Sequence, residues 1–176
     1  MSSHTKSEDG TQRDGETRSA ERQLLERFFA AVQRRDHEAI AACYTEDATF
    51  EDIAFSLSGR SEIHAMWRMI AASDLRMTYV VEDASRQEGH ARWTADYTFR
   101  SAPDAPGRPV HNELRSSFAF RDGRIARQVD ECNALRWGVQ ALGPVPGVLS
   151  TLLPVLRRRA ARRKLDAFKA GERPPG

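Results

Sequence analysis

The sequence predicts an α+β fold in which three helical segments are followed by most of a β-sheet. Apolar residues recur at helical spacing before residue 72, whereas four later segments alternate or are rich in β-branched and aromatic residues. These four strands follow one another directly, so the order differs from the βαβ order of parallel sheets. A length of 176 residues suffices for one domain with a core and tails.

Three helices are expected in the first part of the domain. The first begins near Ser19 and has an apolar face of five residues. Those five are Leu24, Leu25, Phe28, Phe29 and Val32. Asp36 stands where an N-cap belongs, before a short helix that reaches Cys43. Ser61 is the expected cap of a third helix with apolar residues at i, i+3, i+4 and i+7. That stripe is Ile63, Met66, Trp67 and Ile70.

Alternation and turn residues predict the strands. A brief strand from Thr49 places Phe50 and Asp52 on one face. After the third helix, strands are expected over residues 76–83, from the Gly89 turn to residue 100, over 110–121 and over 124–133. Asp122-Gly123 is a strong signal for a hairpin between the last two.

The apolar faces of the last two strands also carry polar residues. Asn112 and Ser116 fall on the face of Phe118, and Gln128 and Asp130 share one face of the final strand. If the sheet curls over the helices to bury a core, these side chains and Asp52 can converge in one concave pocket. Two carboxylates in an apolar cavity suit proton abstraction next to a carbonyl, or activation of a water molecule.

The charge distribution, the two cysteines and the first residues indicate the environment in which the protein is expected to work. The net charge is +2, but residues 155–176 carry eight Lys and Arg against two Asp and Glu, which is +6 and leaves −4 for the rest. Cys43 and Cys132 have neither metal-binding nor redox spacing, so free thiols in a reducing compartment are expected. No apolar run follows Met1, so we expect neither a signal peptide nor an anchor, and a cytoplasmic location.

The composition divides the chain into three parts. Residues 1–18 are polar and charged, which predicts a disordered arm, and residues 19–134 form the domain. Residues 135–176 form an extension that is first apolar and then basic. Its arginines can contact an anionic membrane or an acidic partner, or its apolar part can close the open end of the domain or join a second subunit. These arginines are Arg157, Arg158, Arg159, Arg162 and Arg163. No DNA-reading motif is present, so no specific nucleic acid is expected.

Three stretches resemble the nuclear transport factor 2-like superfamily, which includes ketosteroid isomerase and the SnoaL-like polyketide cyclases. RFFAAVQRRDHEAI and YTEDATFEDIAF are similar to the first helices and the catalytic-base segment of the isomerase, and DGRIARQVDE is similar to the last strand of the cyclases. The resemblance implies a cone-shaped, curved mixed sheet wrapped around three N-terminal helices, a cystatin-like barrel. It also implies a homodimer through the exposed face of the sheet, and Asp52 as the proton-transferring aspartate.

The sequence departs from that family at informative positions. Phe28 stands where the isomerase has an oxyanion-hole tyrosine, and Ser116 where it has a protonated aspartate. In the last strand Asp130 fits the cyclase aspartate, whereas Gln128 replaces a histidine. A phenyl ring donates no hydrogen bond, and loss of one oxyanion donor typically costs about 100- to 1,000-fold in rate. Steroid isomerisation by that mechanism is therefore not expected.

We therefore expect a small-molecule-binding SnoaL-like domain that performs acid/base chemistry of isomerase, cyclase or hydrolase type. The substrate would be a hydrophobic carbonyl or polyketide-like compound, and no cofactor is expected. Asp52 is the expected base and Asp130 the second acid or base. The expected substrate contacts are Phe28, Phe50, Trp67, Asn112, Ser116, Phe118 and Gln128. The alternative is a non-catalytic ligand-binding or dimerising module that is tethered by its basic tail.

Individual residues also have simpler explanations. Asp52 can cap or brace the loop that leads to Gly59, and Asp130 can pair with an arginine such as Arg92 or Arg115 or point at solvent. His64 can be a helix-surface or pocket-rim residue, and no spacing among the five histidines indicates a metal site. The sequence has no Gly-rich phosphate loop, nucleophile elbow or zinc motif.

Overall fold

A computed structural model describes residues 8–101, 105–144, 146 and 154–171. The described helices are α1 (Glu8–Arg34), α2 (His37–Ala42), α3 (Arg60–Ala71), α4 (Ala134–Leu142) and α6 (Pro154–Lys169). The strands are β1 (Tyr44–Glu51), β2 (Ser56–Ser58), β3 (Arg76–Ala84), β4 (Glu88–Phe99), β5 (Arg108–Arg121) and β6 (Arg124–Cys132). The order of these elements confirms the predicted α+β class.

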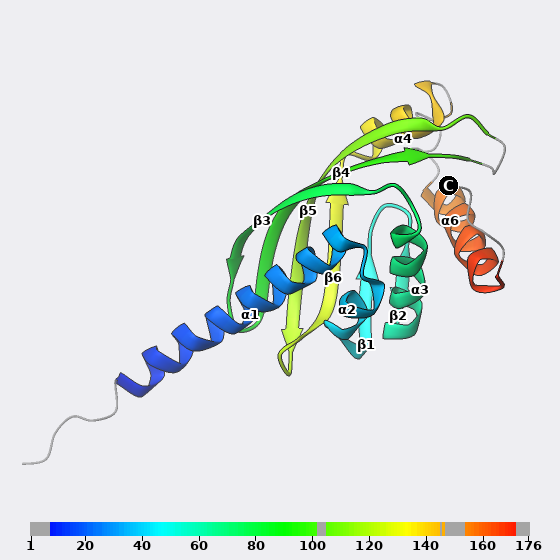
Figure 1. Cartoon of the computed structure of the whole chain (residues 1–176). Helices are drawn as coiled ribbons and strands as arrows, with labels where there is room; N and C mark the ends of the chain where they lie inside the picture. The colour runs from blue at the N-terminus through cyan, green and yellow to red at the C-terminus, as the bar shows by residue number, and fades with distance from the viewer. Residues whose placement is uncertain (1–7, 102–104, 145, 147–153, 172–176) are drawn as a thin grey trace, which may run out of the picture.

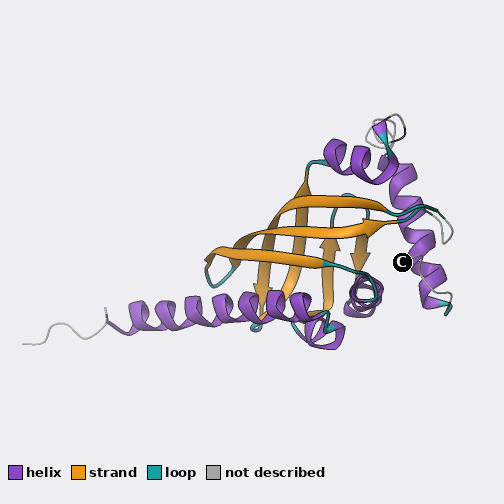
Figure 2. Cartoon of the chain, turned by 45° about the horizontal axis from the view of Figure 1, so that its top comes forward, coloured by secondary structure: helices purple, strands orange, loops and turns teal. Residues whose placement is uncertain are grey.

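The six strands form one mixed sheet in the order β2-β1-β6-β5-β4-β3. The pair of β1 and β6 is parallel, and the other neighbouring pairs are antiparallel. Figures 1 and 2 show the sheet curving over α1, which lies along its concave side, while α3 lies beside β1 and β2. The curved mixed sheet around N-terminal helices confirms the cone-shaped fold that the resemblance implied.

The core lies between α1 and the concave side of the sheet. The apolar face predicted for α1 is buried, and Leu25, Phe28 and Phe29 are at most 1% exposed. Gly89 lies within β4 instead of forming the predicted turn. A Cβ atom at this position would meet Leu25 Cδ1 and Phe120 Cζ at 3.0 Å. A glycine therefore allows the helix and the neighbouring strand to approach this part of β4 closely.

Several element boundaries differ from the predictions. Helix α1 begins at Glu8, so residues 8–18 have a helical backbone where a disordered arm was expected, and residues 1–7 lie outside the described residues. Strand β1 begins at Tyr44 rather than Thr49, and β2 was not predicted. The polar stretch before Thr49 concealed the first half of β1, where the register with β6 shifts between Tyr44 and Thr49.

One of the two predicted helix caps and the predicted hairpin turn are confirmed, and the other cap is wrong. Asp36 is the N-cap of α2, because its Oδ1 accepts a hydrogen bond of 3.0 Å from Ala39 N. Ser61 does not cap α3: the N-cap is Gly59, with a φ of 90° and no side-chain cap. The Asp122-Gly123 turn joins β5 and β6 as predicted, and both residues have positive φ, 53° and 69°.

The extension after β6 packs onto the domain. Helix α4 lies along β5, where the Gln140 side chain bonds to the backbone of His111 in both directions, at 2.7 and 3.1 Å. Helix α6 lies beside α3 (Figure 1), with Leu165 fully buried and Arg162 bonded to Glu62. The Arg68 guanidinium lies 4.9 Å above the ring centroid of Phe168. Most of the apolar stretch between α4 and α6 lies outside the described residues.

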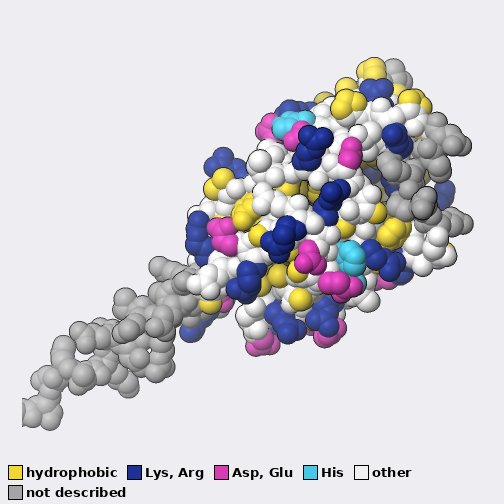
Figure 3. Space-filling model, viewed as in Figure 1, with side chains coloured by type: hydrophobic (Ala, Val, Ile, Leu, Met, Phe, Trp, Pro, Cys, Tyr) yellow, Lys and Arg dark blue, Asp and Glu magenta, His cyan; other side chains and the backbone are white. Residues whose placement is uncertain are grey.

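Three of the five arginines singled out in α6 bind groups of this chain. Arg157 donates to Ile53 O at 2.7 Å, Arg158 to Glu51 at 2.8 Å and Arg162 to Glu62 at 2.8 Å. Figure 3 shows basic and acidic side chains interspersed over the face in view. Within the part of the chain that the structure describes, no helix is long and apolar enough to cross a membrane. Contact of these arginines with a membrane or an acidic partner stays a prediction.

Candidate functional site

A cavity of about 790 Å³ lies between the concave side of the sheet, α3, α4 and α6. This volume is within the range of small-molecule sites. Apolar side chains dominate its wall, and the aromatic ones come from α3, β4, α4 and one loop. They are Trp67, Trp93, Tyr97, Phe99 and Trp137, together with Phe55 from the loop after β1. The acidic groups that line the cavity are Asp52 and Asp130.

Asp52 follows the last residue of β1 and holds the next turn. Its Oδ1 accepts hydrogen bonds from Ala54 N at 2.7 Å and Phe55 N at 2.5 Å, so the bracing role considered from the sequence is realised. The same carboxyl group lines the cavity. Burial raises the pKa of Asp52 to about 6, although the two amide hydrogen bonds and the nearby arginines favour the ionised form.

Asp130 lies on β6, directly opposite Ser116 of β5, and is 5% exposed. Its Oδ1 accepts a hydrogen bond of 2.6 Å from Ser116 Oγ and one of 2.8 Å from Gln128 Nε2, which also lies 3.0 Å from Oδ2. Burial raises the pKa of Asp130 to about 7; the charge of Asp52 acts in the same direction, whereas the Ser116 and Gln128 bonds oppose the shift.

A chain of hydrogen bonds holds the partners of Asp130 in place. Trp67 Nε1 donates to Tyr44 Oη at 3.1 Å, and Tyr44 in turn donates to Gln128 Oε1 at 2.5 Å. On the other side, Trp93 Nε1 donates to Ser116 Oγ at 2.8 Å. Burial raises the pKa of Tyr44 well above its usual value, so the phenol stays neutral and remains a donor. Both donors to Asp130 are therefore fixed in orientation by buried aromatic side chains.

The residues expected to contact a substrate divide into three groups. Trp67 and Asn112 line the cavity. Ser116 and Gln128 are fully buried and hydrogen-bond Asp130, so they lie one layer behind the wall. The remaining three, Phe28, Phe50 and Phe118, lie in the hydrophobic core and are not among the residues that line the cavity. Phe28 and Phe50 pack edge-on against Trp67, with ring centroids at 5.7 and 6.3 Å.

The simpler explanation for Asp130 is not realised. Its hydrogen-bond partners are Ser116 and Gln128, while Arg92 pairs with Glu82. Asp130 is thus a buried carboxyl group held by neutral donors, which leaves its charge without a cationic partner in direct contact among the described residues.

Part of the cavity wall was missed from the sequence. Trp93 and Tyr97 alternate with polar residues along β4, and this alternation was the available signal. Trp137 of α4 donates to Tyr97 Oη at 2.7 Å. Burial raises the pKa of Tyr97 to about 12, so its phenol also stays neutral. No sequence pattern indicated that Trp137 would reach this wall.

Helix α6 forms the remaining side of the cavity with a mixed surface. Leu156, Ala160 and Ala161 supply apolar contacts, and Arg157 and Lys164 supply cations. Burial lowers the pKa of Lys164, whose Nζ lies 5.6 Å from the ring centroid of Phe99. The positive charge of Arg157 favours the ionised form of Asp52. The extension therefore contributes both shape and charge to the cavity.

The potential metal ligands lie elsewhere. Among the described residues, the one group of three such side chains is His37, Glu38 and His64, and none of these lines the cavity. What the cavity offers is two carboxyl groups with raised pKa values in an aromatic enclosure, of which Asp130 is buried and Asp52 is half-buried. Such groups can exchange protons with a bound molecule near neutral pH.

A family model described as the SnoaL-like domain matches residues 25–128. The match includes Asp52, Ser116 and Gln128 and ends before Asp130, α4 and α6. Among curated proteins, none matches the sequence.

Solved structures share the fold. A candidate polyketide cyclase from Xanthomonas campestris superposes with a TM-score of 0.62 at 22% identity, over 71% of this chain and 98% of that chain. An LEH-like epoxide hydrolase from M. tuberculosis gives 0.54 at 17% identity, over 81% and 98%. SalBIII, an epoxide hydrolase/cyclase-like enzyme with a role in pyran ring formation in the polyether salinomycin, gives 0.57 at 16% identity, over 65% and 92%.

Proposed function

Because the chain belongs to the SnoaL-like domain family, we propose that its cavity binds a small hydrophobic carbonyl or polyketide-like compound and performs acid/base chemistry on it. The observation that carries this proposal is the pair of carboxyl groups, Asp52 and Asp130, in one apolar cavity. Their pKa values are raised to about 6 and about 7. General acids and bases are most effective when their pKa lies near the working pH.

The two carboxyl groups suit different roles. At neutral pH Asp52 is mostly ionised, and its Oδ1 already accepts two amide hydrogen bonds, so its other oxygen is the one that would take a proton. Asp130 is protonated in a large fraction of molecules at the same pH and can donate a proton to an oxygen atom of the substrate. We assign Asp52 as the base and Asp130 as the acid.

The neighbouring residues would position the substrate. The Asn112 amide can donate a hydrogen bond to a carbonyl oxygen, and the indole rings of Trp67 and Trp93 offer flat apolar surfaces. Ser116 and Gln128 would act through Asp130 by fixing its carboxyl plane. The proposed chemistry is proton transfer by the protein's own groups and draws on no cofactor.

The range of reactions follows from these groups. Removal of a proton next to a carbonyl by Asp52, with proton return from Asp130, describes an isomerase or a cyclase. Removal of a proton from water by Asp52, with protonation of a leaving oxygen by Asp130, describes a hydrolase. The candidate polyketide cyclase and the epoxide hydrolase with the same fold support both classes of reaction.

The alternative function is a non-catalytic module that holds an apolar ligand. Two observations favour it: Asp52 Oδ1 is bound to the turn after β1, and Phe28, at the position of the isomerase tyrosine, lies in the core and has no hydrogen to donate. Under this alternative the carboxyl groups would only bind the ligand.

The Asp52→Asn variant separates the two functions. The new side-chain oxygen can still accept the amide hydrogen bonds of Ala54 and Phe55, whereas the amide group does not act as a base. Hydrophobic ketones, steroids and aromatic polyketides would be screened by thermal shift, because a ligand that binds only the folded state raises the melting temperature. Asp47→Asn, which alters an exposed carboxyl group of β1, the strand that precedes Asp52, is the matched control.

The catalytic function predicts a ligand that the wild type and Asp47→Asn convert and that Asp52→Asn binds without converting. Equal binding by all three proteins with no conversion by any of them would leave the binding module as the function. Retained conversion by Asp52→Asn would remove Asp52 from the role of base.

We also propose a homodimer through the outer face of the sheet. On that face Val80 is 60% exposed, and a shallow groove around it is lined by Arg92, Glu113 and Arg115. Opposite charges beside an exposed apolar residue can pair with the same patch of a second copy across a twofold axis. Sedimentation velocity should then give a dimer for the wild type and a monomer for Val80→Asp, and a monomeric wild type would contradict the proposal.

A further inference from the structure

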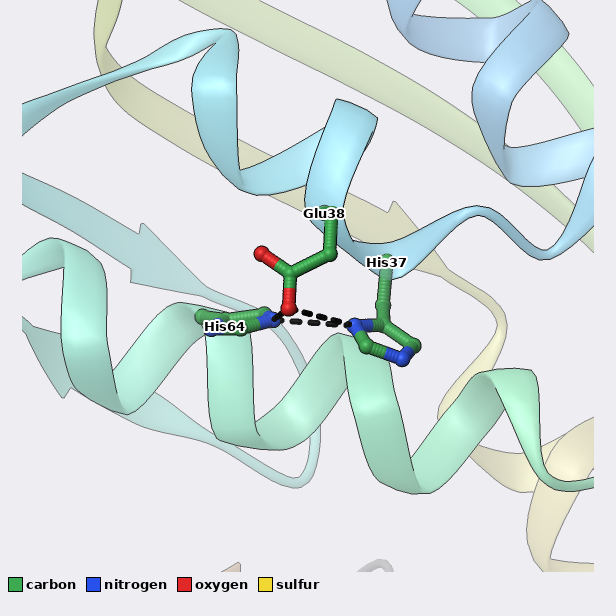
Figure 4. A group of neighbouring side chains, drawn as sticks. All are labelled: His37, Glu38 and His64. Atoms are coloured by element: carbon green, nitrogen blue, oxygen red, sulfur yellow. Dashed lines mark hydrogen bonds and ion pairs between the residues drawn. The ribbon is translucent and has the colours of Figure 1, made fainter.

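Three side chains that can bind metal ions meet at the surface between α2 and α3. His37 and Glu38 are the first two residues of α2, and His64 lies in α3 (Figure 4). In Figure 4 the Glu38 carboxylate and the two imidazole rings point toward one another. The group joins two helices that are adjacent in space and separated by β1 and β2 in the sequence.

The distances between the ligand atoms match a single bound ion. His37 Nδ1 and His64 Nε2 lie 2.9 Å apart, and Glu38 Oε1 lies 3.6 Å from the former and 3.5 Å from the latter. A point in the plane of these three atoms is equidistant from all of them at about 1.9 Å, by the geometry of the triangle. Bonds from zinc to imidazole nitrogen and carboxylate oxygen are about 2.0–2.2 Å, so an ion slightly above this plane would reach all three.

Hydrogen bonding alone does not explain this arrangement. One imidazole can donate to the other across 2.9 Å, and that bond accounts for the two rings. The Glu38 oxygen, however, lies beyond normal hydrogen-bond range of both nitrogens and nearly equally far from each. A position at the start of a helix favours an acidic residue, but it does not direct the carboxylate to a point between two rings.

The ligand types indicate the class of metal. Two imidazole nitrogens and one carboxylate oxygen suit zinc and other divalent transition metals, whereas magnesium and calcium prefer ligands that are all oxygen. The side chains of His37 and His64 are 33% and 28% exposed, and that of Glu38 is 75% exposed. An ion can therefore enter from solvent, and water can complete its coordination.

We propose that His37 Nδ1, Glu38 Oε1 and His64 Nε2 form a binding site for a divalent transition-metal ion, with Zn²⁺ as the best fit to their spacing. The ion would tie α2 to α3. Trp67, three residues after His64 on α3, lines the cavity, so the ion would also fix the helix that carries part of the cavity wall. This site does not depend on the acid/base function proposed for the cavity.

Titration calorimetry with ZnCl₂ on the full chain, first freed of metal with a chelator, tests the proposal. One ion should bind per chain. Even changes around the ligands of a metal site typically cost about 10- to 100-fold in affinity, so loss of a ligand in His37→Gln or His64→Gln should weaken binding by about 100-fold or more. His90→Gln, at a surface histidine that pairs with Asp83, should bind Zn²⁺ like the wild type.

The visible absorption spectrum of bound Co²⁺ provides a second test of the same site. Co²⁺ should produce visible absorption bands in the wild type and in His90→Gln but not in His64→Gln. Circular dichroism and thermal melting without metal would check that the variants are folded, which is expected because both side chains are partly exposed. The proposal is overturned if the wild type binds no Zn²⁺, or if the double variant His37→Gln/His64→Gln binds it with unchanged affinity.

Discussion

Ser116 and Asp130 face each other across β5 and β6, and the Ser116 hydroxyl donates a hydrogen bond of 2.6 Å to Asp130 Oδ1. Ser116 stands at the position where the family resemblance leads one to expect a protonated aspartate. In this chain the carboxyl group comes instead from the opposite residue of the adjacent strand. A buried carboxyl group therefore lies beside this position, although Ser116 itself has none.

The buried Asp130 carboxyl group should make the protein less stable as the pH rises. Its pKa is raised from 3.8 to about 7 in the folded state, so the folded protein holds this proton more tightly than the unfolded chain. The stabilisation from the proton is present in full below about pH 4 and is lost as the pH approaches 7. The loss from this residue is of the order of 4 kcal/mol at most.

Urea unfolding of wild type and Asp130→Asn at pH 5 and pH 8 measures this effect. The free energy of unfolding should fall between these pH values for the wild type and fall less for the variant, whatever the variant's absolute stability. Asp122→Asn, at an exposed carboxyl group in the turn between β5 and β6, should keep the wild-type dependence. An identical pH dependence in Asp130→Asn and the wild type would refute the assignment.

The Tyr44 hydroxyl should be important for stability and for the orientation of Asp130. Its removal in Tyr44→Phe leaves Gln128 Oε1 and Trp67 Nε1 buried without their partner. Each unsatisfied group typically costs about 1–3 kcal/mol. Tyr79→Phe is a suitable control, because the Tyr79 hydroxyl is paired with Glu26 at a half-buried position. Thermal unfolding should show a larger loss for Tyr44→Phe, and equal losses would contradict the proposed network.

Successive side chains of a β-strand point to opposite faces of the sheet. This alternation explains why the sequence placed most of the polar residues around Asp130 on one face. Even-numbered residues of β5 and β6 had to share the concave face, and Ser116, Gln128 and Asp130 are neighbours there. The pattern did not reveal how these residues divide their roles. Whether Gln128 reaches a ligand or Asp130 depends on side-chain orientation, and this is set by Tyr44, whose strand was predicted to begin five residues later.

Contacts between distant segments account for what the sequence did not predict. Helix α6 forms a cavity wall because it packs against α3. Its composition alone did not predict this position, because a basic helix with one apolar side can equally well bind a membrane or a partner protein. His37 and His64 are 27 residues apart, and the packing of two helices brings them together. Sequence spacing could not indicate that pair.

Leu165 should control whether α6 stays on the cavity. Its side chain is fully buried between α6 and the domain, and truncation of a buried leucine typically costs about 2–5 kcal/mol. Because α6 is not part of the sheet, Leu165→Ala should speed amide hydrogen exchange in α6 with little change in β4 and β5. Arg163→Ala, at an exposed position of the same helix, should leave the exchange unchanged. Equal protection of α6 in wild type and Leu165→Ala would show that this side chain does not anchor the helix.

The proposed acid/base pair predicts a narrow pH optimum for any substrate found. Activity requires Asp52 ionised, so kcat/KM should rise as the pH passes about 6. It also requires Asp130 protonated, so kcat/KM should fall as the pH passes about 7. The result is a bell-shaped profile with a maximum near pH 6.5.

Two variants show which carboxyl group causes the rise and which causes the fall of kcat/KM with pH. Asn at position 130 keeps a neutral group that has no carboxylic proton to lose, so Asp130→Asn should remove the fall above pH 7 and lower kcat. Asp52→Asn should abolish turnover at every pH while the ligand still raises the melting temperature. A wild-type profile that is flat between pH 5 and pH 8 would mean that neither carboxyl group exchanges a proton in the rate-limiting step, and the cavity would then be better explained as a binding site.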